Sequence, residues 1–357
     1  MIINLYVFII MAFNQQDTEC MALALKLSKL GRGSVGANPM VGCVITRDNK
    51  IIAQDYHRQY GGGHAEVNAL DQINHNADNC NVYITLEPCS HRGKTPPCVN
   101  ALINANVSKV FVATLDSNPE VSGSGVRLLR DNGIEVEIGL LENAALELNR
   151  GFFKRMKTGV PFVTSKIAMS LDGRVAMKNG QSKWITSNES RNDVQKLRSQ
   201  NQAILTGSGT ILNDNPMLTV RNQELNSNPL RVVIDSNNQI TDESLNIFSN
   251  DSETLILNES NTKILENGKL DLESALITIG SLGINNLLLE AGSGLNGAMI
   301  EAGLIDEFVI YTAPIILGSD AQPMMQIPLK EMSEKISLKI IELSQVADDF
   351  KIRAVPL

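Results

Sequence analysis

One histidine and two cysteines occur in this chain in an order that suits a bound metal ion. His64 belongs to a His64-Ala65-Glu66 motif, and Cys89 and Cys98 follow it with eight residues between them. They offer three ligands of the kind that zinc prefers, and a catalytic zinc site keeps its fourth position open. Zinc lowers the pKa of a water in that position towards ~7. We therefore predict a catalytic zinc site held by His64, Cys89 and Cys98.

Glu66 lies two residues after the predicted histidine ligand, where a carboxylate could move protons near the metal. A glutamate that must exchange protons is poorly suited to be a fourth ligand. The order H-x-E, then P-C, then C is the pattern of zinc-dependent nucleobase deaminases, whose glutamate is the general acid and base. The sequence thus predicts a deaminase with Glu66 as its catalytic residue.

The remaining cysteines and histidines do not extend this site. Cys20, Cys43 and Cys80 lie in apolar periodic segments that are typical of a buried core. His57 and His75 are expected to be structural or at the surface. The five cysteines are an odd number and all lie in the first third, unlike a disulfide framework. This usage fits a reducing compartment, and we expect the cytoplasm.

The charge balance argues against a nucleic-acid partner. The net charge is −8, and residues 1–157 carry 15 basic and 15 acidic side chains, so the excess acid falls in the second half. Neither half has the basic surplus of a nucleic-acid-binding protein, which favours a small-molecule substrate. No stretch is long and apolar enough for a membrane span. Residues 1–10 are expected to be a disordered or mis-started extension.

The elements that must position the metal ligands alternate between strand and helix. Hydrophobic periodicity predicts a hairpin at 40–54, a helix from His64, a strand ending at Glu87 and a helix from Cys98. This alternation indicates an α/β domain with a largely parallel sheet over residues 11–157. Helix N-termini favour thiolates, and strand ends in such sheets collect functional residues.

The second half, residues 158–357, continues the alternation as a second α/β domain, entered through a helix at 141–157. It contains no Cys and no His. Glycine-rich turns follow two predicted strands, at Gly207 and at 292–297, where backbone N–H groups could hold phosphates. Each turn alone fits a plain structural turn equally well. Hydride transfer from a nicotinamide needs neither imidazole nor thiolate, so a dinucleotide-dependent reduction fits this half.

Motifs spread over nearly the whole chain resemble the bifunctional riboflavin-biosynthesis deaminase/reductase family. They are Asn38-Pro39-Met40-Val41-Gly42, His64-Ala65-Glu66 and the segments 86–98, 165–176, 182–187, 204–221, 233–236 and 287–307. Most related deaminases have two residues between the cysteines. The longer spacer here carries His91, Arg92 and Lys94, which favours a phosphorylated substrate. The resemblance implies a cytidine-deaminase-like three-layer domain followed by a dihydrofolate-reductase-like domain.

The resemblance also implies the reaction, the cofactors Zn²⁺ and NADPH, and the binding residues. The reaction is deamination of 2,5-diamino-6-ribosylamino-4(3H)-pyrimidinone 5′-phosphate, followed by reduction of its ribosyl group to ribityl. Residues implied to contact NADPH are Ala168, Trp184, Thr210, Asp214, Ser236, Gly292, Ser293, Gly294, Leu295, Asn296, Gly297 and Ala298. Residues implied to contact substrate are Asn38, Lys94, Ser182, Arg198, Leu218, Arg221 and Glu290.

Two other functions fit parts of the sequence. The second half could be a nucleotide-binding module that regulates a deaminase without catalysing a reduction. The first half could edit nucleic acid, although the acidic charge and the long spacer argue against this. Either Asp214 or Glu290 could assist the reduction. We also expect a homo-oligomer of unspecified size.

Overall fold

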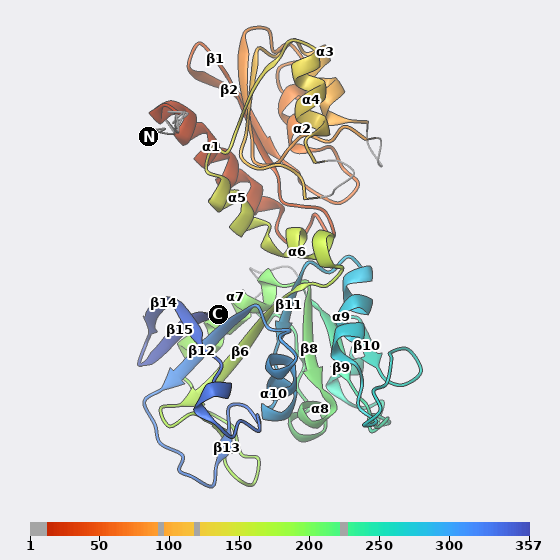
Figure 1. The fold of residues 1–357 in the computed structure, drawn as a ribbon, viewed down its shortest axis with the longest axis vertical. Coiled ribbons are helices and arrows are strands. Elements are labelled where there is room, and N and C mark those ends of the chain that lie inside the picture. Colours follow the sequence, from red (N-terminus) through yellow and green to blue (C-terminus); the bar gives the residue numbers. More distant parts are fainter. Residues whose placement is uncertain (1–12, 92–95, 118–121, 222–227) are drawn as a thin grey trace, which may run out of the picture. The chain divides into compact units, whose positions relative to one another are not determined.

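The computed structural model describes residues 13–91, 96–117, 122–221 and 228–357. It divides between Phe153 and Lys154 into two compact units (Figure 1). The predicted domain boundary after residue 157 lies inside helix α6, Arg150–Thr158. Residues 1–10, for which an extension is predicted, lie outside the described part of the chain. Among the described residues, no helix has the length and apolar character needed to cross a membrane.

The first unit is built on a five-stranded sheet in the order β2-β1-β3-β4-β5. Its strands are β1 (Gly42–Arg47), β2 (Lys50–Tyr56), β3 (Cys80–Ile84), β4 (Lys109–Val112) and β5 (Glu135–Ile138). β3, β4 and β5 are parallel, but β1 is antiparallel to both of its neighbours. The expectation of a largely parallel sheet is therefore wrong here. The two-residue turn at Asp48 and Asn49, both with positive φ, returns the chain directly beside β1.

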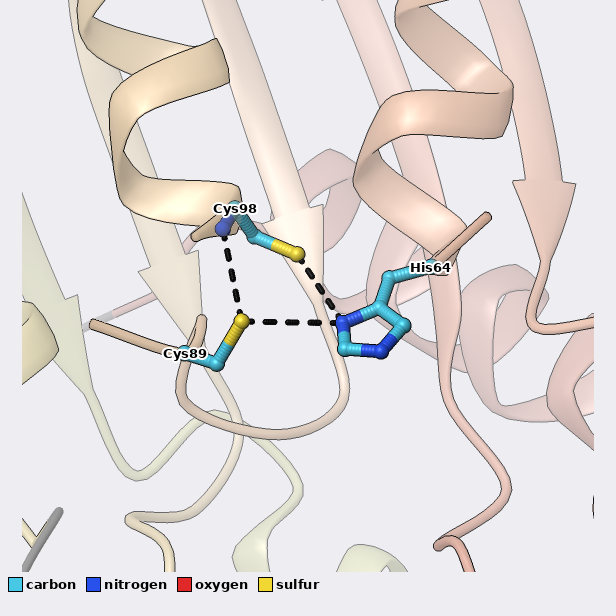
Figure 2. A group of neighbouring side chains, drawn as sticks. All are labelled: His64, Cys89 and Cys98. Atoms are coloured by element: carbon cyan, nitrogen blue, oxygen red, sulfur yellow. Dashed lines mark hydrogen bonds between the residues drawn. The ribbon is translucent and has the colours of Figure 1, made fainter. Parts of the chain in front are cut away.

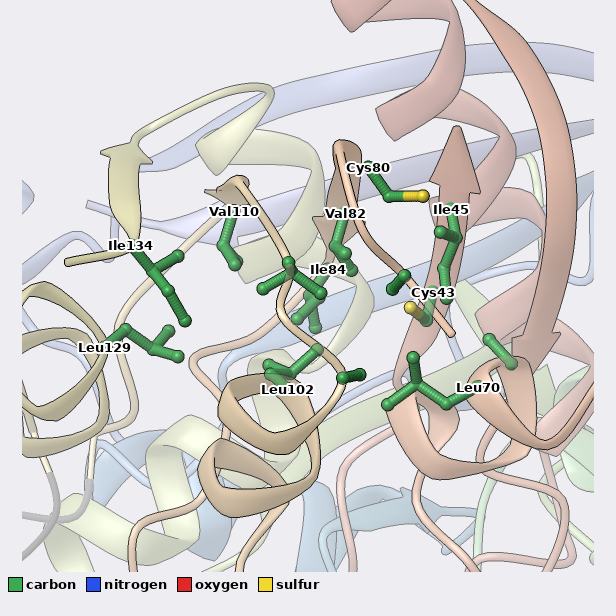
Figure 3. Close-up of a cluster of buried hydrophobic side chains, with 14 of the residues drawn as sticks. Cys43, Ile45, Leu70, Cys80, Val82, Ile84, Leu102, Val110, Leu129 and Ile134 are labelled. Atoms are coloured by element: carbon green, nitrogen blue, oxygen red, sulfur yellow. The ribbon is translucent and has the colours of Figure 1, made fainter. Parts of the chain in front are cut away.

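Helices cover both faces of this sheet, which gives three layers (Figure 1). α1 (Gln15–Ser28) and α5 (Glu142–Leu148) cover one face, and α2 (Ala65–Asp71), α3 (Cys98–Asn104) and α4 (Ser124–Asp131) cover the other. Figure 3 shows the larger core, where Leu70, Leu102 and Leu129 of α2, α3 and α4 pack against branched residues of the strands. The prediction of core cysteines is confirmed, because Cys43 and Cys80 lie in this core, and Cys20 lies in the core beneath α1.

The second unit has an eight-stranded sheet in the order β10-β9-β8-β11-β6-β12-β15-β14. Its strands are β6 (Phe162–Ser170), β8 (Ala203–Gly207), β9 (Leu230–Ile234), β10 (Thr254–Leu257), β11 (Asn286–Leu289), β12 (Glu307–Ala313), β14 (Leu338–Val346) and β15 (Asp349–Pro356). The six strands from β10 to β12 are parallel, and β15 and β14 add antiparallel at one edge. β7 (Arg174–Ala176) and β13 (Gln322–Pro323) form a separate ribbon.

Helices also cover both faces of the second sheet. They are α7 (Asn188–Gln200), α8 (Ser208–Asp214), α9 (Leu272–Ser281) and α10 (Ser293–Glu301). α9 and α10 pack on one face through Ile279 and Met299. α7 and α8 pack on the other face through Leu197 and Ile211. This arrangement is the α/β architecture that the alternating pattern predicts for this half.

Three helical segments differ from the sequence prediction. The single helix expected over 141–157 is two helices, α5 and α6, with a break at Asn149. The Asn149 side chain binds the backbone N–H and carbonyl of Met40 at 2.9 and 2.8 Å, so a distant residue fixes the break. α8 follows Gly207, where the sequence predicts only a turn. α9 is absent from the prediction, although Asp271 caps its N-terminus.

Candidate active sites

The three predicted zinc ligands meet near the carboxyl end of β3 (Figure 2). His64 is the N-cap residue of α2, Cys98 is the first residue of α3, and Cys89 lies in the segment after β3. One ligand atom from each residue lies within 4.8 Å of the other two. His64 Nδ1 is 3.1 Å from the Sγ of Cys98 and 3.6 Å from the Sγ of Cys89. The structure therefore brings the predicted triad together, with Nδ1 facing both sulfurs.

The chemistry of these donors suits zinc. The backbone N–H of Cys98 donates to the Sγ of Cys89 at 3.3 Å. Hydrogen bonds from the Cys98 thiol, the His64 ring and this N–H lower the pKa of Cys89 to about 4. The Cys98 thiol bonds to Cys89 and is buried, and both effects raise its own pKa. These interactions favour the thiolate form of Cys89, which is the form of cysteine that binds metals.

Glu66 lies in the first turn of α2 and is only 3% exposed. Burial raises the pKa of its carboxyl group to about 7; His64 opposes this shift and Cys89 reinforces it. Its Oε2 has no hydrogen-bond partner within the described part of the chain. A carboxyl group with a pKa near neutrality can serve as both proton acceptor and proton donor. Its position and pKa fit the predicted role.

A second histidine supports the loop that carries His64. His57 is 3% exposed, and its ring packs edge-on against that of His64 with 5.2 Å between centroids. Its Nδ1 lies 3.0 Å from the carbonyl oxygen of Gly63, and its Nε2 lies 3.1 Å from the amide nitrogen of Asn38. With the proton on Nδ1, His57 donates to Gly63 and accepts from Asn38. His57 is therefore structural, as predicted, but its structural role is at the site itself.

The spacer between the cysteines is described only in part. His91 is exposed. Arg92 and Lys94, the predicted basic residues, lie outside the described residues.

A buried carboxylate is the centre of the candidate site in the second unit. Glu290 directly follows β11 and accepts from Arg198 Nε at 2.7 Å and from Arg198 Nη2 at 3.1 Å. Lys166 of β6 lies 3.1 Å from the same carboxylate. Burial alone would raise the pKa of Glu290, but Arg198 and Lys166 lower it to about 2. Lys166 is missing from the sequence prediction, and the signal that could have revealed it is that it is the one charged residue of β6.

The predicted cofactor residues lie near the carboxyl ends of the parallel strands. Thr210 and Asp214 belong to α8 after β8, Ser236 follows β9, and Ala168 lies near the end of β6. Gly292 is the N-cap residue of α10, and residues 293–298 form its first turns. This edge of a parallel sheet is where ligands bind in open α/β folds.

Two residues of the glycine-rich segment hold α10 in place. The Asn296 side chain accepts a hydrogen bond from Ser165 Oγ at 2.7 Å and donates to the Ala291 carbonyl at 2.7 Å. A Cβ on Gly297 would lie 2.1 Å from the carbonyl oxygen of Gln326, so only glycine allows this close approach. Gly294 has more room, since the nearest atom to a Cβ there is 3.8 Å away.

Two further predicted residues, Trp184 and Arg221, line the same cavity of about 630 Å³ beside α7, together with Arg191 and Lys196. The indole of Trp184 is 66% exposed, and the guanidinium carbon of Arg191 lies 4.3 Å from its ring centroid. Ser182 is half-buried and close to Trp184 in sequence, whereas Leu218 is buried in the core beneath α8.

Two family models match this chain and cover most of both units. The model of the RibD C-terminal domain matches residues 161–352. The model of the cytidine and deoxycytidylate deaminase zinc-binding region matches residues 14–114. The riboflavin biosynthesis protein RibD of Escherichia coli K12 is 42% identical over 364 residues, which cover 95% of this chain and 99% of that protein. The chain belongs to the RibD family.

Solved structures of RibD proteins agree with this assignment. Acinetobacter baumannii RibD, form 1, has a TM-score of 0.89 at 39% identity, covering 96% of this chain and 99% of that one. The diaminohydroxyphosphoribosylaminopyrimidine deaminase/5-amino-6-(5-phosphoribosylamino)uracil reductase of Thermotoga maritima has a TM-score of 0.87 at 32% identity, with coverages of 96% and 99%. The predicted pair of α/β domains, deaminase-like and reductase, is confirmed.

RibD membership decides between the alternatives that the sequence leaves open. The chain is a bifunctional enzyme of riboflavin biosynthesis, a zinc-binding deaminase joined to a reductase. The RibD C-terminal model covers the second unit, so a reductase is favoured over a non-catalytic regulatory module. The zinc-binding model covers His64, Cys89 and Cys98, whose geometry suits this ion.

We predict that Cys98→Ser weakens zinc binding by ~100-fold or more, because the loss of a ligand exceeds the 10–100-fold cost of losing a supporting residue. Zinc content would be measured by mass spectrometry after dialysis at fixed free zinc. The control is Cys43→Ala, which removes a buried cysteine from the core of the same unit. Equal zinc content in Cys98→Ser and wild type would exclude Cys98 as a ligand.

Proposed function

We propose that the first unit deaminates 2,5-diamino-6-ribosylamino-4(3H)-pyrimidinone 5′-phosphate and that the second reduces the ribosyl group of the product to ribityl with NADPH. The name of the Thermotoga maritima relative, which describes a deaminase and reductase of such phosphoribosylamino compounds, supports this substrate. We assign the deaminase to residues 11–157 and the reductase to residues 158–357. Residues 1–10 are proposed as an extension outside both.

The position of Glu66 carries the deaminase proposal. His64, Cys89 and Cys98 would hold Zn²⁺, which when bound activates water by lowering its pKa. Glu66 accepts a proton from the attacking water and returns one to the ring amino group, which leaves as ammonia. Its carboxyl pKa of about 7 allows both transfers near neutral pH. Asn38 and Lys94 are proposed as substrate contacts, and the amide of Asn38 is oriented by His57.

We expect Glu66→Gln to lower the rate of ammonia release by about 10²–10⁴-fold, which is the usual contribution of a general acid–base residue. Zinc content should stay at the wild-type level, because Glu66 is not a ligand. NADPH oxidation on the deaminated substrate should also be unchanged and serves as the control within the same chain. Ammonia release at the wild-type rate would refute the role of Glu66, whereas loss of zinc would point to a ligand role.

In the second unit, we place the substrate between Arg198 and Arg221. The Arg198 guanidinium already donates hydrogen bonds to the Glu290 carboxylate at 2.7 Å and to the Thr219 carbonyl oxygen at 2.9 Å. Arg221 is exposed and lines the Trp184 cavity, so we propose it as the main phosphate ligand. Ser182, Leu218 and the Arg198–Glu290 pair would complete the substrate site. Arg198 and Lys166 lower the pKa of Glu290 to about 2, so we propose that this carboxylate positions the substrate rather than donating a proton.

NADPH is proposed to bind at the carboxyl edge of the second sheet. The start of α10 lacks a side-chain cap, so the N–H groups of its first turn can bind a diphosphate. Trp184 is exposed and supplies an aromatic surface beside Arg191. The proposed contacts are Ala168, Trp184, Thr210, Asp214, Ser236, Gly292, Ser293, Gly294, Leu295, Asn296, Gly297 and Ala298. Preference for NADPH over NADH is part of the proposal.

We predict that Gly294→Asp binds NADPH at least about tenfold more weakly than Gly294→Asn, a difference of ~1.4 kcal/mol. The two variants have the same shape, and a Cβ at this position has room, so the difference reports the charge facing the diphosphate. Because Trp184 is the single tryptophan, its fluorescence can follow the titration. Equal dissociation constants for the two variants would rule out a phosphate at this turn. A tighter constant for NADH than for NADPH would reverse the cofactor preference.

We also propose that the protein is a cytoplasmic homo-oligomer. The five cysteines are free, as expected in a reducing compartment. β14 is the edge strand of the second sheet and exposes Ile340 and Leu343 at 61% and 63%. An exposed apolar edge strand is a template for pairing with another strand. If the β14 strands of two copies paired, each would satisfy the free backbone groups of the other.

A double change, Ile340→Asp with Leu343→Asp, should convert the oligomer to monomers, because it places charges at the proposed interface. Sedimentation velocity would measure the mass. Ile277→Asp on α9 is the matched control, since Ile277 is 50% exposed but lies away from the edge strand. A wild-type protein that sediments as a monomer, or a double variant that remains oligomeric, would contradict the proposed interface.

A further inference from the structure

The glutamate before the Pro88–Cys89 pair is buried and binds main-chain amides. Glu87 is 4% exposed. Its Oε1 accepts the N–H groups of Gly125 at 2.9 Å and Val126 at 3.2 Å. Its Oε2 accepts those of Gly123 at 2.9 Å and Asp116 at 3.1 Å. Charge-assisted hydrogen bonds of this kind are about twice as strong as neutral ones, so four of them fix the carboxylate firmly.

These amides belong largely to the N-terminus of α4. Gly123 is the N-cap residue of that helix and has no side chain to bind the free N–H groups. Glu87, which is 38 residues from Gly125 in sequence, supplies this cap instead. The negative charge also lies at the positive end of the helix dipole. The segment after β3 is therefore attached to the start of α4.

The residues on both sides of Cys89 contact the same helix start. A Cβ on Gly125 would lie 2.2 Å from the carbonyl oxygen of Pro88, so the first turn of α4 rests directly on this peptide group. The hydroxyl groups of Ser90 and Ser124 lie 2.6 Å apart. Cys89 lies in an irregular segment, so these contacts, rather than the hydrogen bonds of a helix or strand, fix the backbone around it.

Cys89 is held from α3 as well. The backbone N–H of Val99 donates to the carbonyl oxygen of Cys89 at 3.3 Å, and that of Cys98 donates to its Sγ at 3.3 Å. α3 therefore fixes Cys89 on one side, and Glu87 fixes the preceding residues on the other. The sulfur that faces His64 therefore lies between two anchored segments.

We propose that Glu87 is a positioning residue of the deaminase, which holds the Cys89 sulfur in the metal site by attaching residues 87–90 to the start of α4. This inference rests on the proposed role of Cys89 as a zinc ligand. Glu87 itself touches neither metal nor substrate in this proposal. Outer residues that orient metal ligands typically contribute 10–100-fold in metal affinity.

Glu87→Gln tests this proposal in the full-length protein. The change keeps the shape of the side chain, but it replaces one accepting oxygen with an NH₂ group, which cannot accept a hydrogen bond from the backbone N–H groups that face it. We expect zinc affinity, measured by chelator competition, to fall about 10–100-fold. In the Co²⁺-loaded protein, the thiolate-to-cobalt absorption band should shift or weaken. Tyr83→Phe is the matched control: it removes a buried hydrogen bond to Asp17, 2.8 Å long, from the same unit but beneath the opposite sheet face.

Gly125→Ala is a second variant that disturbs the same contact from the helix side, and it keeps the test decisive if Glu87→Gln does not fold. Each variant is compared with Tyr83→Phe at an equal loss of melting temperature. The proposal is supported if either variant binds metal more weakly than this control and also has an altered cobalt spectrum. Metal affinity and spectrum equal to those of the control overturn it. Wild-type zinc content in a Cys89→Ser variant would instead show that Cys89 is not a zinc ligand, and the proposed metal site would then fail apart from the role of Glu87.

Discussion

The deaminase unit depends on one geometric requirement, which is that three side chains from separate elements place their ligand atoms within 4.8 Å of one another. The parallel strand β3 ends where the helices α2 and α3 begin. His64 and Cys98 are thereby held at helix N-termini, whose partial positive charge favours thiolate. The antiparallel pair β1 and β2 adjoins β3, and α2, which carries His64, packs on these two strands.

Buried glutamates recur in both units, and their surroundings give them different properties. Glu66 has an oxygen with no partner in the described residues, and burial raises the pKa of its carboxyl group to about 7. Glu290 is also buried, but Arg198 and Lys166 lower its pKa to about 2. Glu87 binds four backbone amides. The same side chain can thus exchange protons, anchor cations or join two segments, according to what surrounds it.

The sequence alone was sufficient for the features that short-range patterns encode. The metal triad follows from ligand chemistry and order, and most strands and helices follow from hydrophobic periodicity. Features made by distant residues could not be predicted in this way. The break at Asn149 depends on Met40, 109 residues away, and the ionised state of Glu290 depends on Arg198, 92 residues away. The support that His57 gives to Gly63 likewise appears only when the loop is folded.

Cys89 and the start of α3, at the two ends of the cysteine spacer, are joined by direct hydrogen bonds. The backbone of Cys98 binds the sulfur of Cys89, and Val99 binds the Cys89 carbonyl, so α3 closes the loop at its base. A closed base of this kind holds the two sulfurs at a fixed separation, so changes between its ends need not move them.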